Sequence, residues 1–333
     1  MRILLFGGTA WLGRTIAQAA IIANHDITCV ARGSSVPAAA RLVQLDRDLD
    51  QSLSALPAGR WDAVIDLATQ PGHVRRAVDQ LRERADHYLF ISSGNAYASL
   101  SDPGITEDAP LCRPLAADSM TAPHDYGPAK VACEEAVLSA FGPDRTTIIR
   151  PGLIGGPEDP TGRSTYWPLR FARPSNRQGR VLVPDALDYP TSVIDVRDLA
   201  DWIVQLAEVR GGGIFNATGE VTSLGNHLQL AQTVTESEGK MIAAAPDWLT
   251  AQGVHEWMGP KSLPLWISDP QMRGMGALSS LHALENGLSL RPLRDTLADS
   301  LAWAVEANLP TVAGAGLTDG EEQALLTALD AQC

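Results

Sequence analysis

The chain has 333 residues, of which 45% are hydrophobic, so it can bury one large core, or one core with a smaller lobe built around it. Its formal net charge of -13 argues against a nucleic-acid partner, because affinity for nucleic-acid phosphates depends on clustered Lys and Arg. The cysteines have no paired spacing, which predicts reduced thiols and no metal site: Cys29, Cys112, Cys133 and Cys333.

Short apolar runs alternate with amphipathic patterns through the first half of the chain. The first run, residues 3–6, is too short for a signal-peptide core or a membrane span, so we expect a cytoplasmic protein with no membrane partner. The expected helices are 12–23, 72–84 and 130–140, where apolar residues recur at three-to-four spacing. The expected strands are 3–6, 26–31, 41–45, 63–67, 88–92 and 146–150. This alternation predicts an α/β fold with a Rossmann-type, doubly wound parallel sheet.

A glycine-rich turn joins the first expected strand to the first expected helix. Backbone N–H groups and the helix dipole at such a turn can hold the pyrophosphate of a dinucleotide. Ala10 takes the middle position, where glycine usually allows the closest approach to the phosphates. The alternative is a turn that needs its glycines for geometry alone. The expected cofactor contacts are Gly7, Thr9, Ala10, Trp11, Leu12 and Gly13.

Arg32 follows the second expected strand, at the point where NAD-binding proteins usually carry a carboxylate for the ribose. The guanidinium of Arg32 suits a 2'-phosphate, Ser34 adds a hydroxyl donor, and this stretch has no carboxylate that would repel a phosphate. NADP is therefore expected in preference to NAD. The alternative is a solvated surface arginine. Asp46 and Asp48 follow the third strand and are candidates for contact with adenine, with solvated loop carboxylates as the alternative.

Tyr126 and Lys130 are four residues apart at the start of an expected helix, so both side chains can project from one face. A phenol needs a nearby cation to donate or accept a proton near neutral pH, and Lys130 is positioned to supply it. Ser93 follows the fifth expected strand, at the edge of the sheet where ligands bind, and can polarise a substrate carbonyl. Ser92 is the less favoured serine. The expected catalytic residues are Ser93, Tyr126 and Lys130.

The order of these motifs resembles that of the extended and atypical short-chain dehydrogenase/reductases, including the NAD-dependent epimerase/dehydratase branch. Further matching stretches are 61–66, 150–157, 193–200 and 291–297. The resemblance implies a Rossmann domain with a smaller substrate lobe. It also implies that Tyr126 is the acid/base, that Lys130 holds the nicotinamide ribose, and that Ser93 orients the reacting oxygen. Pro151, Gly152 and Ala68 are then expected beside the nicotinamide and its ribose.

The expected domain boundaries leave the second lobe discontinuous. Residues 1–150 with about 191–217 form the cofactor domain, about 151–190 and 218–317 form the substrate lobe, and 318–333 form a C-terminal helix that packs on its own lobe. Thr318 and Glu321 fit a capping box at the start of that helix.

The Pro- and Gly-rich stretch 151–190 is expected to form loops over a cleft. Its arginines are interpreted as a solvated face that balances charge, with recognition of an anionic substrate as the alternative. They are Arg163, Arg170, Arg173, Arg177 and Arg180. Tyr166 and Trp167 either line a pocket or anchor the loops, and His124 is interpreted as structural.

The predicted function is reversible hydride transfer between NADP(H) and a carbonyl or secondary alcohol of a small molecule. One alternative is a nucleotide-sugar epimerase or dehydratase that keeps NAD bound. A second is a non-catalytic dinucleotide sensor or RNA-associated protein. The chain is expected to be a monomer, or a homodimer formed through the helices at 72–84 and 130–140.

Overall fold

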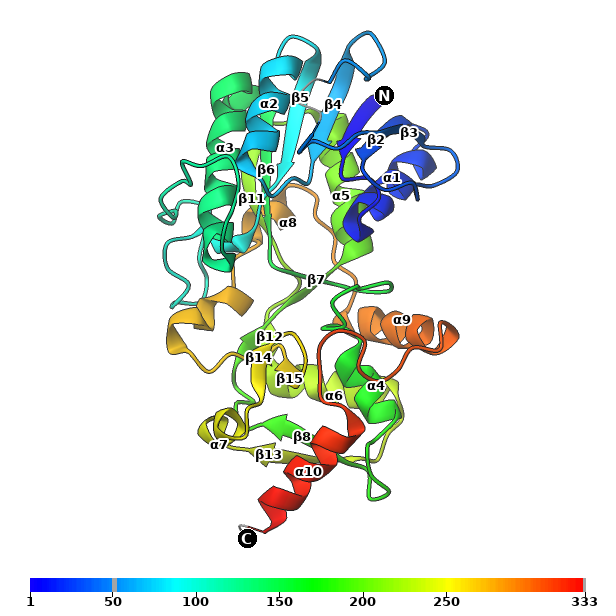
Figure 1. Cartoon of the computed structure of the whole chain (residues 1–333), viewed down its shortest axis with the longest axis vertical. Coiled ribbons are helices and arrows are strands. Elements are labelled where there is room, and N and C mark those ends of the chain that lie inside the picture. Colours follow the sequence, from blue (N-terminus) through cyan, green and yellow to red (C-terminus); the bar gives the residue numbers. More distant parts are fainter. Residues whose placement is uncertain (50–52, 332–333) are drawn as a thin grey trace.

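A computed structural model describes residues 1–49 and 53–331, and its largest feature is a seven-stranded parallel sheet (Figure 1). The strand order is β11-β6-β5-β4-β1-β2-β3, so the direction of winding reverses between β1 and β4. The predicted doubly wound α/β fold is confirmed. The strands are β1 (Arg2–Phe6), β2 (Asp26–Ala31), β3 (Arg41–Gln44), β4 (Trp61–Asp66), β5 (Ala85–Ile91), β6 (Thr146–Pro151) and β11 (Gly213–Ala217).

Helices cover both faces of this sheet. α1 (Trp11–Ile22) packs beside α5 (Val196–Val209) on one face, and α2 (Pro71–Leu81) packs beside α3 (Tyr126–Phe141) on the other. In β1, Ile3 and Leu5 join the apolar cluster of the first face, while Leu4 and Phe6 join that of the second. Because successive side chains of a strand point to opposite faces, a continuous apolar run is what a sheet buried on both sides requires.

The third expected helix begins at Tyr126, as the spacing of Tyr126 and Lys130 predicted, four residues before the apolar pattern at 130–140. Pro128 lies in its first turn, where the missing N–H group costs no hydrogen bond. Tyr126 and Lys130 therefore lie on the same helix, one turn apart.

The second lobe is built from short elements that come from distant parts of the chain. Its core contains Tyr166, Trp167 and Trp266, each fully buried. The described elements outside the seven-stranded sheet and its four covering helices belong to the second lobe or to the connections of the sheet half. They are β7 (Leu153–Gly155), α4 (Tyr166–Ala172), β8 (Arg180–Pro184), β9 (Pro190–Thr191), β10 (Val193–Asp195), β12 (Thr222–Ser223), α6 (Leu224–Val234), β13 (Lys240–Ala244), α7 (Pro246–Ala251), β14 (His255–Trp257), β15 (Ser262–Pro264), α8 (Leu281–Glu285), α9 (Leu293–Glu306), α10 (Asp319–Asp330) and the 3-10 turns η1 (Gly94–Ala96), η2 (Pro123–Asp125), η3 (Pro143–Arg145) and η4 (Pro270–Gly276).

The expectation that residues 151–190 form loops over a cleft is wrong for part of that stretch. It contains α4 and β8, both buried in the core of the second lobe. Pro168 lies in the first turn of α4, where it does not break the helix. The prolines and glycines therefore shorten the elements of this lobe without removing them.

The C-terminal helix α10 packs against the second lobe, as predicted. Thr318 and Glu321 form the expected capping box. Arg170, which is completely buried, binds Asp319 at 2.8 Å, lies 3.4 Å from Glu322, and donates to the Leu317 carbonyl. The interpretation of Arg170 as part of a solvated face is wrong, because this side chain joins α4 to the end of the chain.

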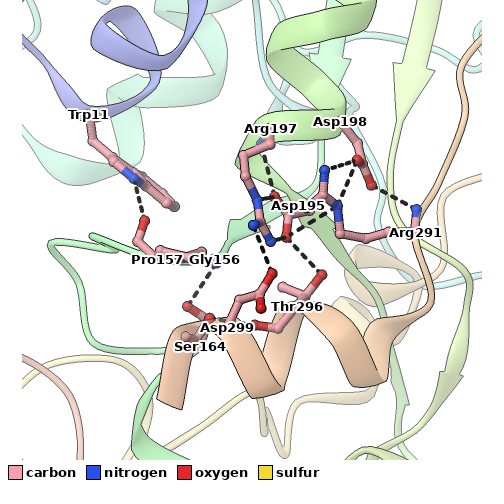
Figure 2. Close-up of polar contacts among 11 residues, drawn as sticks. Trp11, Gly156, Pro157, Ser164, Asp195, Arg197, Asp198, Arg291, Thr296 and Asp299 are labelled. Atoms are coloured by element: carbon pink, nitrogen blue, oxygen red, sulfur yellow. Dashed lines mark hydrogen bonds and ion pairs between the residues drawn. The ribbon is translucent and has the colours of Figure 1, made fainter. Parts of the chain in front are cut away.

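A network of charged side chains connects the sheet half to the second lobe (Figure 2). Asp195, at the end of β10, accepts hydrogen bonds from Arg197 of α5 and from Thr296 of α9. Arg197 also binds Asp299 of α9 at 2.7 Å. Burial opposes ionisation of Asp195, but the hydrogen bonds from Arg197 and Thr296 outweigh it and hold the pKa of Asp195 below its usual value. The stretches 193–200 and 291–297 thus form the junction between the two lobes.

Within the described ranges, no helix is long and apolar enough to cross a membrane. In the same ranges, no group of three or more His, Cys, Asp or Glu side chains is arranged to hold a metal ion. Cys29, Cys112 and Cys133 are free thiols, and Cys333 lies outside the described residues.

Candidate active site

Two adjoining cavities lie where the strands of the sheet end. The first has a volume of about 550 Å³ and extends from the glycine turn to the ends of β2 and β3. The second has a volume of about 710 Å³ and lies between the end of β5, the start of α3 and the second lobe. Leu67 and Thr69 line both cavities, so the two meet after the end of β4. Volumes of this size suit a small-molecule ligand.

The glycine turn forms one side of the first cavity. Gly7 has a φ of 92°, which favours glycine, and a Cβ atom at Gly13 would lie 2.1 Å from the Gly7 carbonyl oxygen. Ala10 is the N-cap of α1 and offers no side-chain acceptor to the first amide groups of the helix. These uncapped N–H groups are suited to an anionic phosphate, and the glycines also meet a steric requirement of the turn.

Arg32 lines the first cavity, with 72% of its side chain exposed. Its guanidinium lies 3.6 Å from the carboxylate of Asp48, which also receives a 2.7 Å contact from His73. The expectation that no carboxylate lies beside Arg32 is therefore wrong. Asp48 is 16 positions later in the sequence, and only the pairing of β3 with β2 brings it next to Arg32.

Arg47 forms the floor of the first cavity and was missed by the sequence-based interpretation. Its two terminal nitrogens bind the fully buried carboxylate of Asp66 at 3.0 and 3.1 Å, and its guanidinium stacks 4.3 Å above the ring of Phe6. Burial of Asp66 opposes its ionisation, but Arg47 and a hydrogen bond from Tyr88 hold the pKa of Asp66 below its usual value. The pair fixes the loop that carries Asp46 and Asp48.

Lys130 is 3% exposed and is fixed at the inner end of the second cavity. Its ammonium group donates to the carbonyl oxygens of Ala68 at 2.8 Å and Ile91 at 2.7 Å, at the ends of two neighbouring strands. An ammonium has three N–H groups, so one remains. The Nζ atom lies 5.8 Å from the ring centroid of Tyr126, whose hydroxyl has no hydrogen-bond partner within the described chain.

The two serines at the end of β5 have different partners. Ser92 is buried and donates to the carboxylate of Glu134 at 2.5 Å, and Glu134 is in turn held by Arg150. Ser93 is half-buried and lines the second cavity, and its hydroxyl oxygen accepts from the amide of Asn95 at 3.2 Å. Ser93 therefore keeps its hydroxyl proton for a ligand, whereas Ser92 does not.

The structure distributes the expected site residues between the two cavities. Gly13 and Ser34 line neither of them. The first cavity is lined by Gly7, Thr9, Ala10, Arg32, Asp46 and Ala68. The second is lined by Trp11, Leu12, Ser93, Tyr126, Lys130, Pro151 and Gly152.

Among the other lining residues of the second cavity, Arg163 was considered as a contact for an anionic substrate, whereas Met258, Met275 and Leu278 were not singled out in advance. They come mainly from the second lobe, and include Arg163, Trp257, Met258, Met275 and Leu278. Their positions far along the chain gave no sequence signal for a shared cavity. Tyr166 and Trp167 lie in the core instead, and His124 is exposed at the surface.

Sequence comparison connects the first part of the chain to a known family. Residues 3–84 match the model of the NAD dependent epimerase/dehydratase family. A 2'-dehydrokanamycin reductase from Streptomyces kanamyceticus is 28% identical over 160 residues. That match covers 46% of this chain and 43% of the reductase, so it spans less than half the length of either protein.

Solved structures extend the likeness to most of the chain at the level of the fold. A UDP-glucose 4-epimerase from Thermotoga maritima, solved with UDP-glucose, is 18% identical with a TM-score of 0.64 and covers 92% of this chain and 100% of its own. A Bordetella bronchiseptica enzyme solved with NAD and UDP is 17% identical with a TM-score of 0.64, covering 93% and 97%.

The chain thus has the fold of these solved enzymes and resembles, through residues 3–84, the NAD dependent epimerase/dehydratase family, in agreement with the resemblance that its motifs suggested.

Proposed function

We propose that the protein is an NADP(H)-dependent oxidoreductase that interconverts a carbonyl and a secondary alcohol on a small molecule. The observation that carries this proposal is the grouping, in the second cavity, of the Ser93 hydroxyl, the unpartnered Tyr126 hydroxyl and the fixed Lys130 ammonium. The adjoining first cavity, with its glycine turn and uncapped helix start, fits the phosphates of a dinucleotide. The Streptomyces relative is named as a reductase, which agrees with this chemistry.

Each of the three side chains has a separate role in the proposed reaction. The nicotinamide supplies the hydride in reduction and accepts it in oxidation. Tyr126 donates a proton to the carbonyl oxygen during reduction and removes it during oxidation. Ser93 donates a hydrogen bond to the same oxygen. Lys130 places its ammonium group near the ring of Tyr126 and has one N–H group left for the ribose of the cofactor.

We further propose that residues 1–150 with about 191–217 form the cofactor domain, that about 151–190 and 218–317 form the substrate lobe, and that 318–333 form its terminal helix. Two observations support this division. α5 and β11 complete the sheet half. Arg163 and the side chains at 257–278 reach the second cavity from the other lobe.

Replacement of Tyr126 by phenylalanine tests the proposed chemistry. The hydroxyl is lost while the ring stays, so we expect reduction of a carbonyl substrate by NADPH to slow by about 100- to 10,000-fold with little change in NADPH affinity. The rate of reduction is measured from the decrease of nicotinamide absorbance as NADPH is oxidised. NADPH binding is measured from nicotinamide fluorescence. Undiminished turnover in Tyr126→Phe contradicts the proposal.

Titration with NADPH and NADH tests the cofactor preference. Arg32 offers an exposed guanidinium to a 2'-phosphate, so Arg32→Ala is expected to weaken NADPH binding by about tenfold or more and to leave NADH binding nearly unchanged. Asp48 repels the same phosphate, so Asp48→Asn is expected to tighten NADPH binding by about two- to fivefold. Asp86→Asn, an exposed partner of Arg60 at the start of β5, is the matched control. If Arg32→Ala weakens NADPH binding and NADH binding equally, Arg32 does not determine the preference for NADPH.

The second candidate is a nucleotide-sugar epimerase or dehydratase that keeps NAD bound. Asp48 beside Arg32 favours it, because a carboxylate at this edge of the cavity can hold ribose hydroxyls. The structurally similar enzyme from Bordetella was solved with NAD and UDP. NAD released from the purified protein by denaturation, together with conversion of a UDP-sugar without any added nicotinamide nucleotide, favours this candidate over the reductase.

A further inference from the structure

The second cavity is lined by two charged side chains, Lys130 and Arg163, among its described residues. Lys130 is bound by the carbonyls of Ala68 and Ile91, deep in the sheet half. Arg163 comes from the loop between β7 and α4 and faces the cavity from the second lobe. The rest of the described lining is apolar or uncharged, and includes Leu100 and Met275.

Arg163 is half-buried and has no ion pair within the described chain. Its Nε atom binds the Thr161 hydroxyl at 3.1 Å, and its guanidinium lies 5.2 Å from the ring centroid of Trp257. Its two terminal nitrogens have no hydrogen-bond partner among the described residues. Burial lowers the pKa of Arg163, although Asp159 and Tyr126 nearby oppose that shift.

The carboxylate of Asp159 attracts Arg163 but forms no ion pair with it among the described residues, because both of its oxygens accept hydrogen bonds within the loop. One oxygen of the buried Asp159 carboxylate accepts from the amide and hydroxyl of Thr161 at 2.8 and 2.7 Å. The other accepts from the amide and hydroxyl of Ser164 at 3.0 and 2.8 Å. Asp159 therefore shapes the loop and leaves the terminal nitrogens of Arg163 free.

The other arginines of the same stretch have partners or are solvated. Arg170 binds Asp319, Arg180 binds Asp330 at 2.6 Å, and Arg173 donates to the Leu309 carbonyl. Arg177 is exposed. Arg163 differs from all four because it is partly removed from water, lines the second cavity and has no ion pair among the described residues.

The loop that carries Arg163 is held in place by the start of α1. The indole of Trp11 donates to the Pro157 carbonyl at 2.9 Å, and the Gly156 amide donates to Ser164 at 3.2 Å (Figure 2). Arg14 binds Glu158 at 2.8 Å. These contacts position the guanidinium before any substrate arrives, which reduces the ordering cost of binding.

We propose that Arg163 is the specificity-determining residue of the second cavity, and that it binds a carboxylate on the carbonyl substrate while Tyr126 and Ser93 hold the reacting oxygen. The substrate class is thus a keto acid and its hydroxy acid. A planar guanidinium with two free nitrogens matches a carboxylate in a bidentate arrangement. Of the two cations that line the cavity among the described residues, Lys130 directs two of its three N–H groups to backbone carbonyls, so Arg163 is the main partner for one negative charge. This inference rests on the proposed function and names its substrate class.

The test compares matched substrates and matched arginine variants. Levulinate and benzoylformate are each paired with the corresponding amide, and kcat/KM is measured at saturating NADPH. The wild-type protein is expected to prefer the carboxylates. Arg163→Gln is expected to reduce the ratio of carboxylate to amide kcat/KM by about 10- to 100-fold, mainly through KM. Arg163→Lys should restore part of the ratio, and Arg177→Gln should leave it unchanged.

Direct binding separates a failure of this inference from a failure of the proposed function. Thermal unfolding of the protein with NADP⁺ is followed with added levulinate, benzoylformate or their amides. If no carbonyl is reduced but the carboxylates stabilise the wild type and not Arg163→Gln, the proposed reaction fails and the anion site stands. If the carboxylates stabilise both proteins equally or neither, or if the amides are preferred, the assignment of Arg163 is overturned.

Discussion

The two lobes each bury an arginine beside a glutamate, but the two pairs differ in their surroundings. In the sheet half, Arg150 binds both oxygens of Glu134, and Ser92 and Tyr97 supply further hydrogen bonds. In the second lobe, the Arg170 and Glu322 side chains approach only to 3.4 Å, and one oxygen of Glu322 has no hydrogen-bond partner. The first pair lies directly behind the serine end of β5, and the second fastens α10.

This difference shows that burial of charge does not by itself identify a functional site. A pair with every donor and acceptor satisfied fixes nearby atoms, and in the sheet half those atoms border the second cavity. A pair with unsatisfied atoms, such as Arg170 with Glu322, joins two segments but fixes the positions of their atoms less closely. That is enough to attach the terminal helix α10. Variants of the two pairs should therefore differ in whether activity changes along with stability.

The largest effect is expected from Arg170→Met in the second lobe. Glu322 would be left buried without a counter-charge, which should lower the free energy of unfolding by about 3–5 kcal/mol, measured by urea denaturation. The double variant Arg170→Met with Glu322→Gln removes the stranded charge and should recover part of the loss. Arg180→Ala, which breaks only the exposed pair with Asp330, should cost about 1 kcal/mol or less. If Arg170→Met and Arg180→Ala lower the free energy of unfolding by similar amounts, the ion pair of Arg170 does not stabilise the protein as a buried pair should.

The next largest effect is expected on the pH dependence of stability, which depends on one buried histidine in each lobe. Burial lowers the pKa of His227 in the second lobe to about 4, and burial, with Arg210 and Arg145 nearby, lowers the pKa of His87 in the sheet half to about 4. Both are neutral in the folded protein near pH 7. Between about pH 6.5 and 4 the unfolded chain binds more protons, so stability falls as the pH falls, by up to about 3 kcal/mol for each histidine.

His227→Phe should remove one part of this pH dependence. Neither nitrogen of His227 has a hydrogen-bond partner, whereas His87 binds Thr147 at 2.7 Å, so the second-lobe histidine is the simpler one to replace. The measurement is the unfolding free energy from pH 7 to pH 5, where the slope of the variant should be smaller than that of the wild type. An unchanged slope would show that His227 does not titrate in this range.

Between the two buried pairs, the smaller effect on stability is expected from Glu134→Gln in the sheet half. The amide keeps the oxygen that accepts from Ser92 and from Arg150 Nε, and Arg150 also donates to Tyr97 and to the Glu107 carbonyl, so loss of the charge should cost about 1–3 kcal/mol. Because this pair supports the end of β5, kcat should also fall, whereas the folded fraction of Arg170→Met should keep its kcat. Equal kcat in the two variants would remove the functional distinction between the pairs.

The sequence by itself determined the features that depend on local geometry. The apolar runs of the first half specify strands buried on both faces, and the steric limits at Gly7 and Gly13 specify the turn before α1. The spacing of Tyr126 and Lys130 places both on one face of α3, and Thr318 with Glu321 specifies the start of α10. In each case the interacting residues lie within a few positions of one another.

The tertiary structure alone decided which distant side chains share a site. Asp48 lies beside Arg32 only because β3 pairs with β2, and Arg47 binds Asp66 at the end of the sheet. The arginines of the stretch 151–190 look alike in sequence, yet Arg170 is buried under α10 and Arg163 lines the second cavity. A charge has no preferred partner along the chain, and its role depends on which segments pack around it, because desolvation makes an unpaired charge costly.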